Sequence, residues 1–572
     1  MTPTGRSNPD SSKPSGPNRR GLLAAAGGVA AGLIGAQGAG TAEAADRAAV
    51  PEAADRAAVP EAAGGAAVPE ATGFGPVSVR PGDTRYESLL RGNNFRFAGR
   101  PDEIRVVGST GQVVRAVSDA VRSGRRIAVR SGGHCFENFT GDPAVRLLLD
   151  LSPMDAVGYD AARGAFAVQP GATLGHVYRT LFKGWGVTIP AGGCPEVGAG
   201  GHLAGGGYGP LSRRYGSVVD HLYGVEVVVA DRDGAARAVV ATREPDDPHR
   251  DLWWAHTGGG GGNFGVVTRY WLRSPDARGS DPSQLLPPAP REQLVCLVTW
   301  AWDQQMTERA FTALLRNFGV WHERNSAPDS PYAGLYAVLI PAHRSAGGFV
   351  MGVQIDAGLP GAERMVNDFV NAVTADTGVK PAGDTRRTFP WLHPTTWPGT
   401  GEPGDVSARR FKIKAGYLRR SFTDRQLSAI YRNLTNPTGT PGDGMLLIGY
   451  GGRVRAVEPE ATAVAQRDVV MKAVYQSIWT YGTEDGANLA WIRAFYRDVY
   501  ADTGGVPVPG EVSDGSYINY ADSDLADPAL NTSGVPWHTL YYKDNYARLQ
   551  QVKARWDPRN VFRHALAIEP PG

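Results

Sequence analysis

One glycine-rich stretch decides the fold of this chain: Gly192-Gly193-Cys194-Pro195-Glu196-Val197-Gly198-Ala199-Gly200-Gly201-His202, followed by Gly205-Gly206-Gly207-Tyr208-Gly209. It is too rich in glycine for a stable helix, so we predict a loop that is held by whatever it wraps. An earlier stretch, Arg130-Ser131-Gly132-Gly133-His134-Cys135, follows the apolar run 126–129, which is typical of a strand that ends in a turn. Glycines in such turns let the backbone approach a ligand closely and expose N–H groups to phosphate oxygens.

Each glycine-rich stretch carries one nucleophilic side chain, His134 in the first and Cys194 in the second. Both can attack an electron-poor ring, and each lies in a loop that can approach a flat molecule. A lone histidine in a turn is more often a surface or core residue, and a lone cysteine usually packs as a small hydrophobe. The residues alone leave both interpretations open. His202 has a simpler interpretation, in which its ring nitrogens brace the loop.

Length, charge and cysteine content exclude several classes of protein. A chain of 572 residues is too long for a single core, so we expect more than one domain. The net charge of +2 and the lack of a basic stripe argue against nucleic-acid binding. The three cysteines, Cys135, Cys194 and Cys296, form no CxxC pair, which argues against a zinc ribbon or a thioredoxin-like motif. We predict no metal site, and the odd number of cysteines excludes a pure disulfide framework.

The N-terminus has the pattern of an export signal. Arg19-Arg20 precedes a stretch without charge, 21–41, and the small-residue site Ala42-Glu43-Ala44. This pattern resembles a twin-arginine signal peptide over residues 1–44. A membrane anchor is the alternative, since about 20 residues suffice to span, but Ala and Gly partition weakly into lipid. A nine-residue unit then recurs three times, and it has too little bulky apolar surface to fold, so we predict a disordered leader over residues 45–80.

Apolar periodicity predicts the elements of two regions. Order is expected to begin near Tyr86. In the first region we expect helices at 111–122 and 174–185, strands at 126–129 and 147–151, a strand and turn at 165–171, a strand pair at 224–229 and 238–240, and a third glycine loop at 258–262. In the second region we expect one sheet with helices on one face, with strands at 294–302, 335–341, 350–356, 411–418 and 445–449 and helices at 307–324, 362–376, 424–434 and 461–478. Residues 381–408 are rich in Pro, Gly and Thr and are predicted to form a lid loop.

Five separated motifs together resemble one known family. They are Ser-Gly-Gly-His at 131–134, Gly-Gly-Cys-Pro at 192–195, Gly-His-Leu-Ala-Gly-Gly-Gly-Tyr-Gly at 201–209, Gly-Gly-Asn-Phe-Gly-Val-Val-Thr at 261–268, and a closing segment at 541–562. In this order they resemble the berberine bridge enzyme-like oxidases of the PCMH or vanillyl-alcohol oxidase superfamily. Within the family the pattern is closest to bacterial oxidases of glycosylated natural products, and next to the oligosaccharide oxidases.

The resemblance implies an α+β fold that binds FAD. Residues 81–277 would form a PCMH-type FAD-binding domain, residues 278–505 an inserted substrate domain, and residues 506–572 a segment that returns to the FAD. The cofactor would be bound bicovalently, through His134 to its 8α-methyl carbon and through Cys194 to its C6 atom. Further FAD-binding positions implied by the motifs are Arg130, Ser131, Gly132, Gly133, Val197, Gly198, Gly201, His202, Gly206, Gly207, Tyr208, Gly261, Asn263, Gly265, Val266, Val267, Asn519, Tyr542 and Asn545.

The implied activity is that of a secreted oxidase. It would take a hydride from an alcohol carbon, on a sugar or a glycosylated natural product, and reduce O₂ to H₂O₂. Val197 occupies the position of the family's oxygen gatekeeper, where valine resembles the oxidase version. The alternative is a dehydrogenase that uses another acceptor, or a degenerate member that only carries flavin and binds a ligand. The expected partners are a small alcohol or glycoside and O₂, without nucleic acid or, after signal cleavage, a membrane.

The segment 514–522 supplies the candidate catalytic residues. It resembles the family's Tyr-x-Asn-Tyr strand, and the resemblance implies that Tyr520 is the base. Tyr517 would then stack on the substrate, and Tyr450, which lies outside this segment beside Gly451-Gly452, would assist. Alternation along a strand predicts Tyr517 and Asn519 on one face and Ile518 and Tyr520 on the other. The alternative is that both tyrosines only pack in a buried strand.

A tyrosine base needs help from its surroundings. A phenol titrates near 10 and is a poor base at pH 7 unless positive charge lies close by. Lys412, Lys414 and Arg410 in a predicted strand could supply that charge. Other aromatic residues that could face the substrate are Tyr417, Trp391, Trp397 and Trp479.

Overall fold

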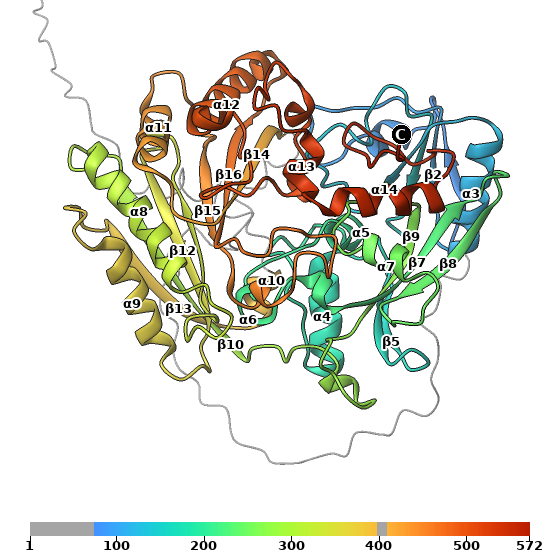
Figure 1. The fold of residues 1–572 in the computed structure, drawn as a ribbon, viewed down its shortest axis with the longest axis horizontal. Coiled ribbons are helices and arrows are strands. Elements are labelled where there is room, and N and C mark those ends of the chain that lie inside the picture. The colour runs from blue at the N-terminus through green and yellow to red at the C-terminus, as the bar shows by residue number, and fades with distance from the viewer. Residues whose placement is uncertain (1–73, 397–408) are drawn as a thin grey trace, which may run out of the picture.

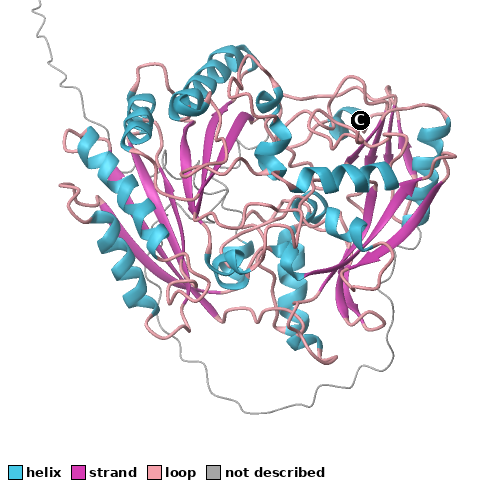
Figure 2. Cartoon of the chain, in the orientation of Figure 1, coloured by secondary structure: helices cyan, strands magenta, loops and turns pink. Residues whose placement is uncertain are grey.

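The computed structural model describes residues 74–396 and 409–572. They form a mixed α+β structure with three sheets (Figures 1 and 2), which confirms the predicted fold class. The predicted signal peptide and the nine-residue repeats, which end at Glu70, lie outside the described residues, whereas the end of the predicted disordered leader 45–80 contains a strand at Val77–Val79. Within the described part of the chain, every helix is too short or too polar to cross a membrane.

The first sheet has four strands, in the order β1 (Val77–Val79), β2 (Glu103–Val106), β4 (Leu147–Asp150) and β3 (Ile127–Arg130). The last three are parallel, because helix α3 (Thr110–Arg122) carries the chain from β2 to β3. Ser109 caps α3 by accepting a hydrogen bond from the Gln112 N–H, as an N-cap serine does. Strand β1 precedes α2 (Tyr86–Leu90), so the predicted start of order near Tyr86 is too late.

The second sheet has five antiparallel strands, in the order β5 (Val157–Asp160), β6 (Ala165–Val168), β9 (Val266–Leu272), β7 (Leu222–Ala230) and β8 (Ala236–Thr242). Helix α4 (Leu174–Trp185) has the predicted bounds, because Thr173 caps its start and Gly186, at φ 69°, ends it in the left-handed conformation. Short helices α5 (Ala199–Ala204), α6 (Ser212–Tyr215) and α7 (Arg250–Ala255) lie between these strands in sequence.

The third sheet is antiparallel and has seven strands. Their order is β13 (Gly383–Pro390), β10 (Glu292–Ala301), β12 (Gly348–Asp356), β11 (Tyr336–Ile340), β15 (Asp443–Gly449), β16 (Met471–Trp479) and β14 (Arg410–Leu418). Helices α8 (Glu308–Arg324), α9 (Ala362–Thr374), α11 (Asp424–Thr435) and α12 (Asp485–Val499) cover one face (Figure 1). A sheet with helices on one face was predicted, but helix α12 was not. The other face turns toward the part of the molecule that holds the two smaller sheets (Figure 1).

Two predictions for this region are wrong. Residues 471–479, assigned to a helix at 461–478, form strand β16, whose residues are buried on both faces. A strand buried on both faces shows no alternation, so its apolar pattern cannot be told from that of a buried helix. Residues 383–390, assigned to a lid loop, form the edge strand β13, and 392–396 form helix α10 (Leu392–Thr396). The exposed, polar residues of β13 carry no strand pattern, and pairing with β10 alone makes it a strand.

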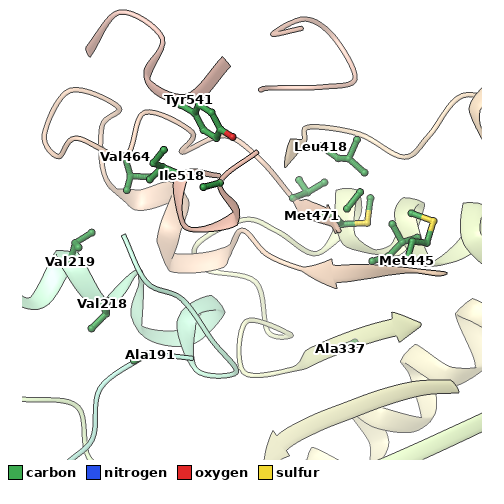
Figure 3. Close-up of a cluster of buried hydrophobic side chains, with 14 of the residues drawn as sticks. Ala191, Val218, Val219, Ala337, Leu418, Met445, Val464, Met471, Ile518 and Tyr541 are labelled. Carbon is green, nitrogen blue, oxygen red and sulfur yellow. The ribbon is translucent and has the colours of Figure 1, made fainter. Parts of the chain in front are cut away.

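One large apolar core joins these parts. Figure 3 shows Val218 and Ala191 from the glycine-loop region in the same cluster as Met445 and Met471 of the seven-stranded sheet. Val464 lies between two glycine loops, where a Cβ on Gly206 or on Gly258 would collide with its side chain. The C-terminal helices α13 (Trp537–Tyr542) and α14 (Asn545–Trp556) add to this core.

Candidate active site

The prediction that the glycine-rich stretch 192–209 is a loop throughout is wrong, because Ala199–Ala204 forms helix α5. Tertiary contacts overcome the low helix propensity of its glycines. The Ala199 N–H donates to Ala172 O at 2.8 Å, and the Gly200 N–H donates to Pro170 O at 2.9 Å. Tyr270 donates its hydroxyl to Gly200 O at 2.8 Å, and Ala199 and Leu203 are buried.

The first and second glycine loops touch each other through bare backbone. A Cβ on Gly132 would collide with Gly198 N, and a Cβ on Gly198 would collide with Gly132 N. Only glycine permits this approach. His134 lies two residues after Gly132, and Cys194 lies four residues before Gly198. Both side chains are half-buried. The structure therefore brings together the loops that carry the two predicted attachment residues.

Burial sets the protonation of these residues. Desolvation lowers the pKa of His134 to about 4, so its imidazole is neutral at pH 7 and keeps a free lone pair. Asn93 Nδ2 lies 3.4 Å from His134 Nδ1 and orients the ring. Burial raises the thiol pKa of Cys194 above its usual value and that of Cys135 to about 11.

Open space lies beside these loops. A cavity of about 530 Å³ is lined by residues 130–134 of the first glycine loop and by Glu196 of the second. Its other polar lining residues include Arg91, His176, Asp150 and Asp155. Gly201 and Gly261 are exposed, and a Cβ on either would meet nothing within 4 Å. The bare backbone, the guanidinium groups of Arg91 and Arg130 and the half-buried His134 fit a flat cofactor that carries phosphate groups, and Cys194 is not among the residues that line this cavity.

Several of the predicted FAD-binding side chains instead hold the loops in place. His202 Nε2 accepts the Gly192 N–H at 3.1 Å, which supports its interpretation as a brace. Asn263 donates to Gly259 O at 2.9 Å and accepts the Ile568 N–H. The other bracing contacts are Arg130 with Asp150, Ser131 with Pro170 O, Tyr542 with Gly259 O, and Asn545 with Pro459 O and Thr462 O.

The remaining predicted positions pack tightly. A Cβ on Gly207 would collide with the His202 ring, and one on Gly265 with Val227 and Val228. Gly133 has a φ of 73°, which favours glycine. Val266 is buried, whereas Val197 and Val267 are half-buried. Backbone shape, rather than side-chain polarity, is what these positions contribute.

A cluster of tyrosines faces the loops. Tyr520 and Tyr208 share a hydrogen bond between their hydroxyls at 2.6 Å. Tyr517 donates its hydroxyl to Gly206 O at 3.0 Å, and Asn519 Nδ2 donates to the Tyr517 hydroxyl at 2.9 Å. The buried Tyr450 ring contacts Tyr208 edge-on, and its hydroxyl has no partner among the described residues.

The predicted alternation within this segment is wrong. Residues Ile518–Tyr520 form a 3-10 turn instead of a strand. Residues three apart lie on the same side of such a turn, so Tyr520 returns to Tyr517 with ring centroids 5.0 Å apart. Ile518 packs on the other side, against Gly260.

Lys472 is a functional candidate that sequence reasoning missed. It is 1% exposed, and its Nζ has no hydrogen-bond partner among the described residues. Nζ lies over four tyrosine rings, 3.3 Å from the Tyr208 centroid and 3.9, 4.2 and 4.9 Å from those of Tyr517, Tyr450 and Tyr417. Burial, and secondly the nearby Arg467, lower the pKa of Lys472 well below its usual value. A lysine inside the apolar run 469–475 was the available signal, but the wrong helix assignment hid it.

The cations that we expected near Tyr520 are paired elsewhere. Lys412 and Lys414 contact Asp522, and Arg410 contacts Asp485. Of the other aromatic candidates, Tyr417 contacts Lys472, Trp391 and Trp479 are buried packing residues, and Trp397 lies outside the described residues.

Tyr520 itself is half-buried. Its ring stacks on Phe136 with centroids 5.6 Å apart and planes 8° from parallel. Burial raises the pKa of Tyr520 to about 12, and the hydrogen bond with Tyr208 opposes this rise. Phe136 lies two residues after His134, so the ring stack places Tyr520 beside the first glycine loop.

Comparisons with known proteins agree with this geometry. A family model described as an FAD binding domain matches residues 101–234, and one described as berberine and berberine like matches residues 516–569. The chain is 56% identical to the aclacinomycin-N/aclacinomycin-A oxidase of Streptomyces galilaeus, over 87% of this chain and 90% of that protein. It is 31% identical to the hexose oxidase of Chondrus crispus, over 85% and 93%. The solved structure of a glycopeptide hexose oxidase complexed with teicoplanin is similar with a TM-score of 0.83 and 54% identity, over 87% and 99% of the two chains.

Proposed function

The chain belongs to the berberine bridge enzyme-like family of FAD-dependent oxidoreductases, and on this premise we propose that it oxidises an alcohol carbon of a sugar, free or carried on a natural product, with O₂ as the electron acceptor. The observation that carries this proposal is the hydrogen-bonded Tyr208–Tyr520 pair beside the loops of His134 and Cys194. Relatives named as an aclacinomycin oxidase, a hexose oxidase and a glycopeptide hexose oxidase support the substrate class.

His134 and Cys194 would hold FAD through two covalent bonds. When bound, FAD supplies the hydride acceptor and passes the electrons on to O₂. Both side chains are half-buried, and the neutral His134 imidazole is a competent nucleophile. Two bonds to the cofactor allow an open groove, because the protein need not bury the ring to hold it. An open groove suits a bulky glycoside.

Tyr520 would accept the proton of the substrate hydroxyl. Removing a hydride from an alcohol carbon is difficult unless the oxygen loses its proton in the same event, so a base must lie within hydrogen-bond reach. The hydrogen bond with Tyr208 opposes the rise in the pKa of Tyr520 and so favours its ionised form. Tyr517 would then contact the substrate ring, and Tyr450 would assist.

Lys472 would balance the charge that forms on the tyrosines. Burial disfavours its ammonium form in the resting site, whereas a phenolate within the Tyr208–Tyr520 pair would favour it. The protonation of the Lys472 amine and the ionisation of the Tyr208–Tyr520 pair are therefore coupled. When Tyr520 ionises, the Lys472 amine would accept a proton.

Replacing Lys472 by Met should move the pH profile of flavin reduction to higher pH. Methionine keeps the chain length but removes the amine, so the phenolate loses its neighbouring cation and the pKa of Tyr520 rises. The measurement is the anaerobic rate of flavin reduction between pH 6 and 10. Lys380→Met, at an exposed position, is the control and should match the wild type. An unshifted profile in Lys472→Met would remove this role.

A peroxidase-coupled assay with a panel of sugars and glycosides tests the proposed function directly. We expect H₂O₂ to appear with at least one substrate, since valine at position 197 supports an oxidase. Flavin bleaching without H₂O₂ would instead support a dehydrogenase with another acceptor. Absence of bleaching over the whole panel would favour a flavin-carrying binding protein.

Export through the twin-arginine route is a separate proposal. It rests on Arg19-Arg20 and the uncharged stretch 21–41, and it fits a protein that folds around its cofactor before export. Replacing both arginines by lysine should leave the protein inside the cell, whereas the wild type should be found outside with its N-terminus near Ala45. Cell fractionation and N-terminal sequencing provide the measurement. Unchanged secretion of the lysine variant contradicts the route, and a membrane-bound wild type would favour an anchor.

A further inference from the structure

A buried cluster of charged side chains lies behind the tyrosines. It contains Lys412 and Lys414 of β14 and the carboxylates of Glu137, Asp522 and Asp524, none of which is more than 7% exposed. Arg493, at the edge of the cluster, pairs with Asp524 at 2.8 Å. Two buried lysines thus face three buried carboxylates, and the partly exposed Arg493 completes the charge balance.

The contacts of the cluster cross between distant segments. Lys412 Nζ lies 2.7 Å from Asp522 Oδ1 and also contacts Glu137 Oε1. Lys414 Nζ lies 2.6 Å from Asp522 Oδ2 and 3.0 Å from Asp524 Oδ2. The Ser523 hydroxyl donates to Glu137 Oε2 at 3.1 Å. Carboxylates from two segments that are far apart in sequence therefore share the same lysine.

These segments are the ones that carry the proposed chemistry. Glu137 follows Phe136, whose ring stacks on Tyr520, and it lies three residues after His134. Asp522 lies two residues after Tyr520. Asn94 also links these segments through uncharged hydrogen bonds, because its Nδ2 donates to Phe136 O at 3.1 Å and to Phe411 O at 3.0 Å. The cluster joins the His134 loop, the Tyr520 turn and strand β14.

Stability alone does not explain such a cluster. Burying charges costs desolvation energy that their attraction roughly offsets, and well-packed apolar side chains often stabilise a core equally well. Short charged hydrogen bonds differ from apolar contacts in that they fix direction and distance. The useful property of the cluster is therefore geometric.

We propose that Glu137, Lys412 and Asp522 are positioning residues, which hold the Tyr520 turn in register with the loop that carries His134. The consequence for catalysis rests on the proposed function, in which Tyr520 meets a substrate bound against the flavin. A general base works only at hydrogen-bond distance, so a small slip between the two segments lowers the rate.

Glu137→Gln in the holoenzyme tests this proposal. The variant keeps the size of the side chain but leaves Lys412 with one carboxylate fewer. Hydrogen exchange should accelerate in two separate segments, 131–137 and 517–524, although only the first contains the substitution. The kcat should fall by roughly tenfold to 10²-fold, the scale expected for a misplaced reacting group, with KM little changed.

Two further variants make the result specific. Asp356→Asn breaks another ion pair, Arg214–Asp356 at 2.7 Å, which joins α6 to β12 away from the cluster. It should leave exchange in both segments and kcat unchanged. Ser523→Ala removes only the neutral hydrogen bond to Glu137 and keeps every charge. Ser523→Ala should accelerate exchange in both segments, but less than Glu137→Gln does. If Glu137→Gln does not fold, the exchange data of Ser523→Ala test whether the cluster couples the two segments.

The proposal is overturned if exchange accelerates only around the substituted residue, or if kcat stays at the wild-type value while both segments loosen. An inactive wild type with normal flavin content would contradict the proposed function alone. In that case the exchange data still decide whether the cluster couples the two segments.

Discussion

Replacing Tyr520 by Phe should slow anaerobic reduction of the flavin by about 10²-fold or more, the usual scale for loss of a general base. Phenylalanine keeps the ring that stacks on Phe136 but removes the oxygen that Tyr208 contacts. Fold and flavin content should therefore be unchanged. Stopped-flow absorbance of the flavin, in the absence of O₂, provides the measurement.

The pH dependence of the same reaction is a second part of this expectation. Burial holds the pKa of Tyr520 at about 12, so only a small fraction of the phenol is ionised at pH 7. The wild-type rate should therefore rise with pH between 6 and 10, and this rise should be lost in Tyr520→Phe. A variant that reduces its flavin at the wild-type rate would give the role to Tyr450 or Tyr517, and the corresponding Phe variants would identify which.

Flavin should remain attached to acid-denatured wild-type protein, because covalent bonds survive unfolding. His134→Ala and Cys194→Ala should each retain flavin through the remaining bond, whereas the double variant should release all of it. Absorbance of the precipitate and the mass of flavin-bearing peptides measure the two attachments separately. Cys135→Ala is the matched control, since Cys135 neighbours His134 and burial raises its thiol pKa to about 11. Flavin that washes out of the denatured wild type would refute covalent attachment.

Local signals in the sequence were sufficient for many helices and strands. Helix α4 begins at the Thr173 cap and ends at Gly186, and both signals can be read from adjacent residues. Helix α8 likewise begins after the Thr307 cap. Strands such as β10 and β12 have short apolar runs bounded by turn residues. These elements depend on interactions within a few positions of the chain.

Elements that depend on distant partners were predicted incorrectly. Strand β16 is buried between β15 and β14, and only this pairing distinguishes it from a helix. Helix α5 forms in spite of its glycines because Pro170 and Ala172 receive its free N–H groups. Both outcomes depend on contacts that no short window of sequence contains.

The family could be recognised from sequence alone, and His134 and Cys194 could be named as the proposed attachment residues, because glycine turns and their nucleophiles are short motifs in a fixed order. The surroundings of Tyr520 could not be. Lys412 and Lys414 looked available, yet each meets carboxylates more than a hundred positions away. Lys472, assigned to a helix, instead places its buried amine among the tyrosines, where burial lowers its pKa well below the usual value. The sequence states which charges exist, but burial and pairing decide which of them remain near the base, since a buried charge must be neutralised by whichever opposite charge the fold brings to it.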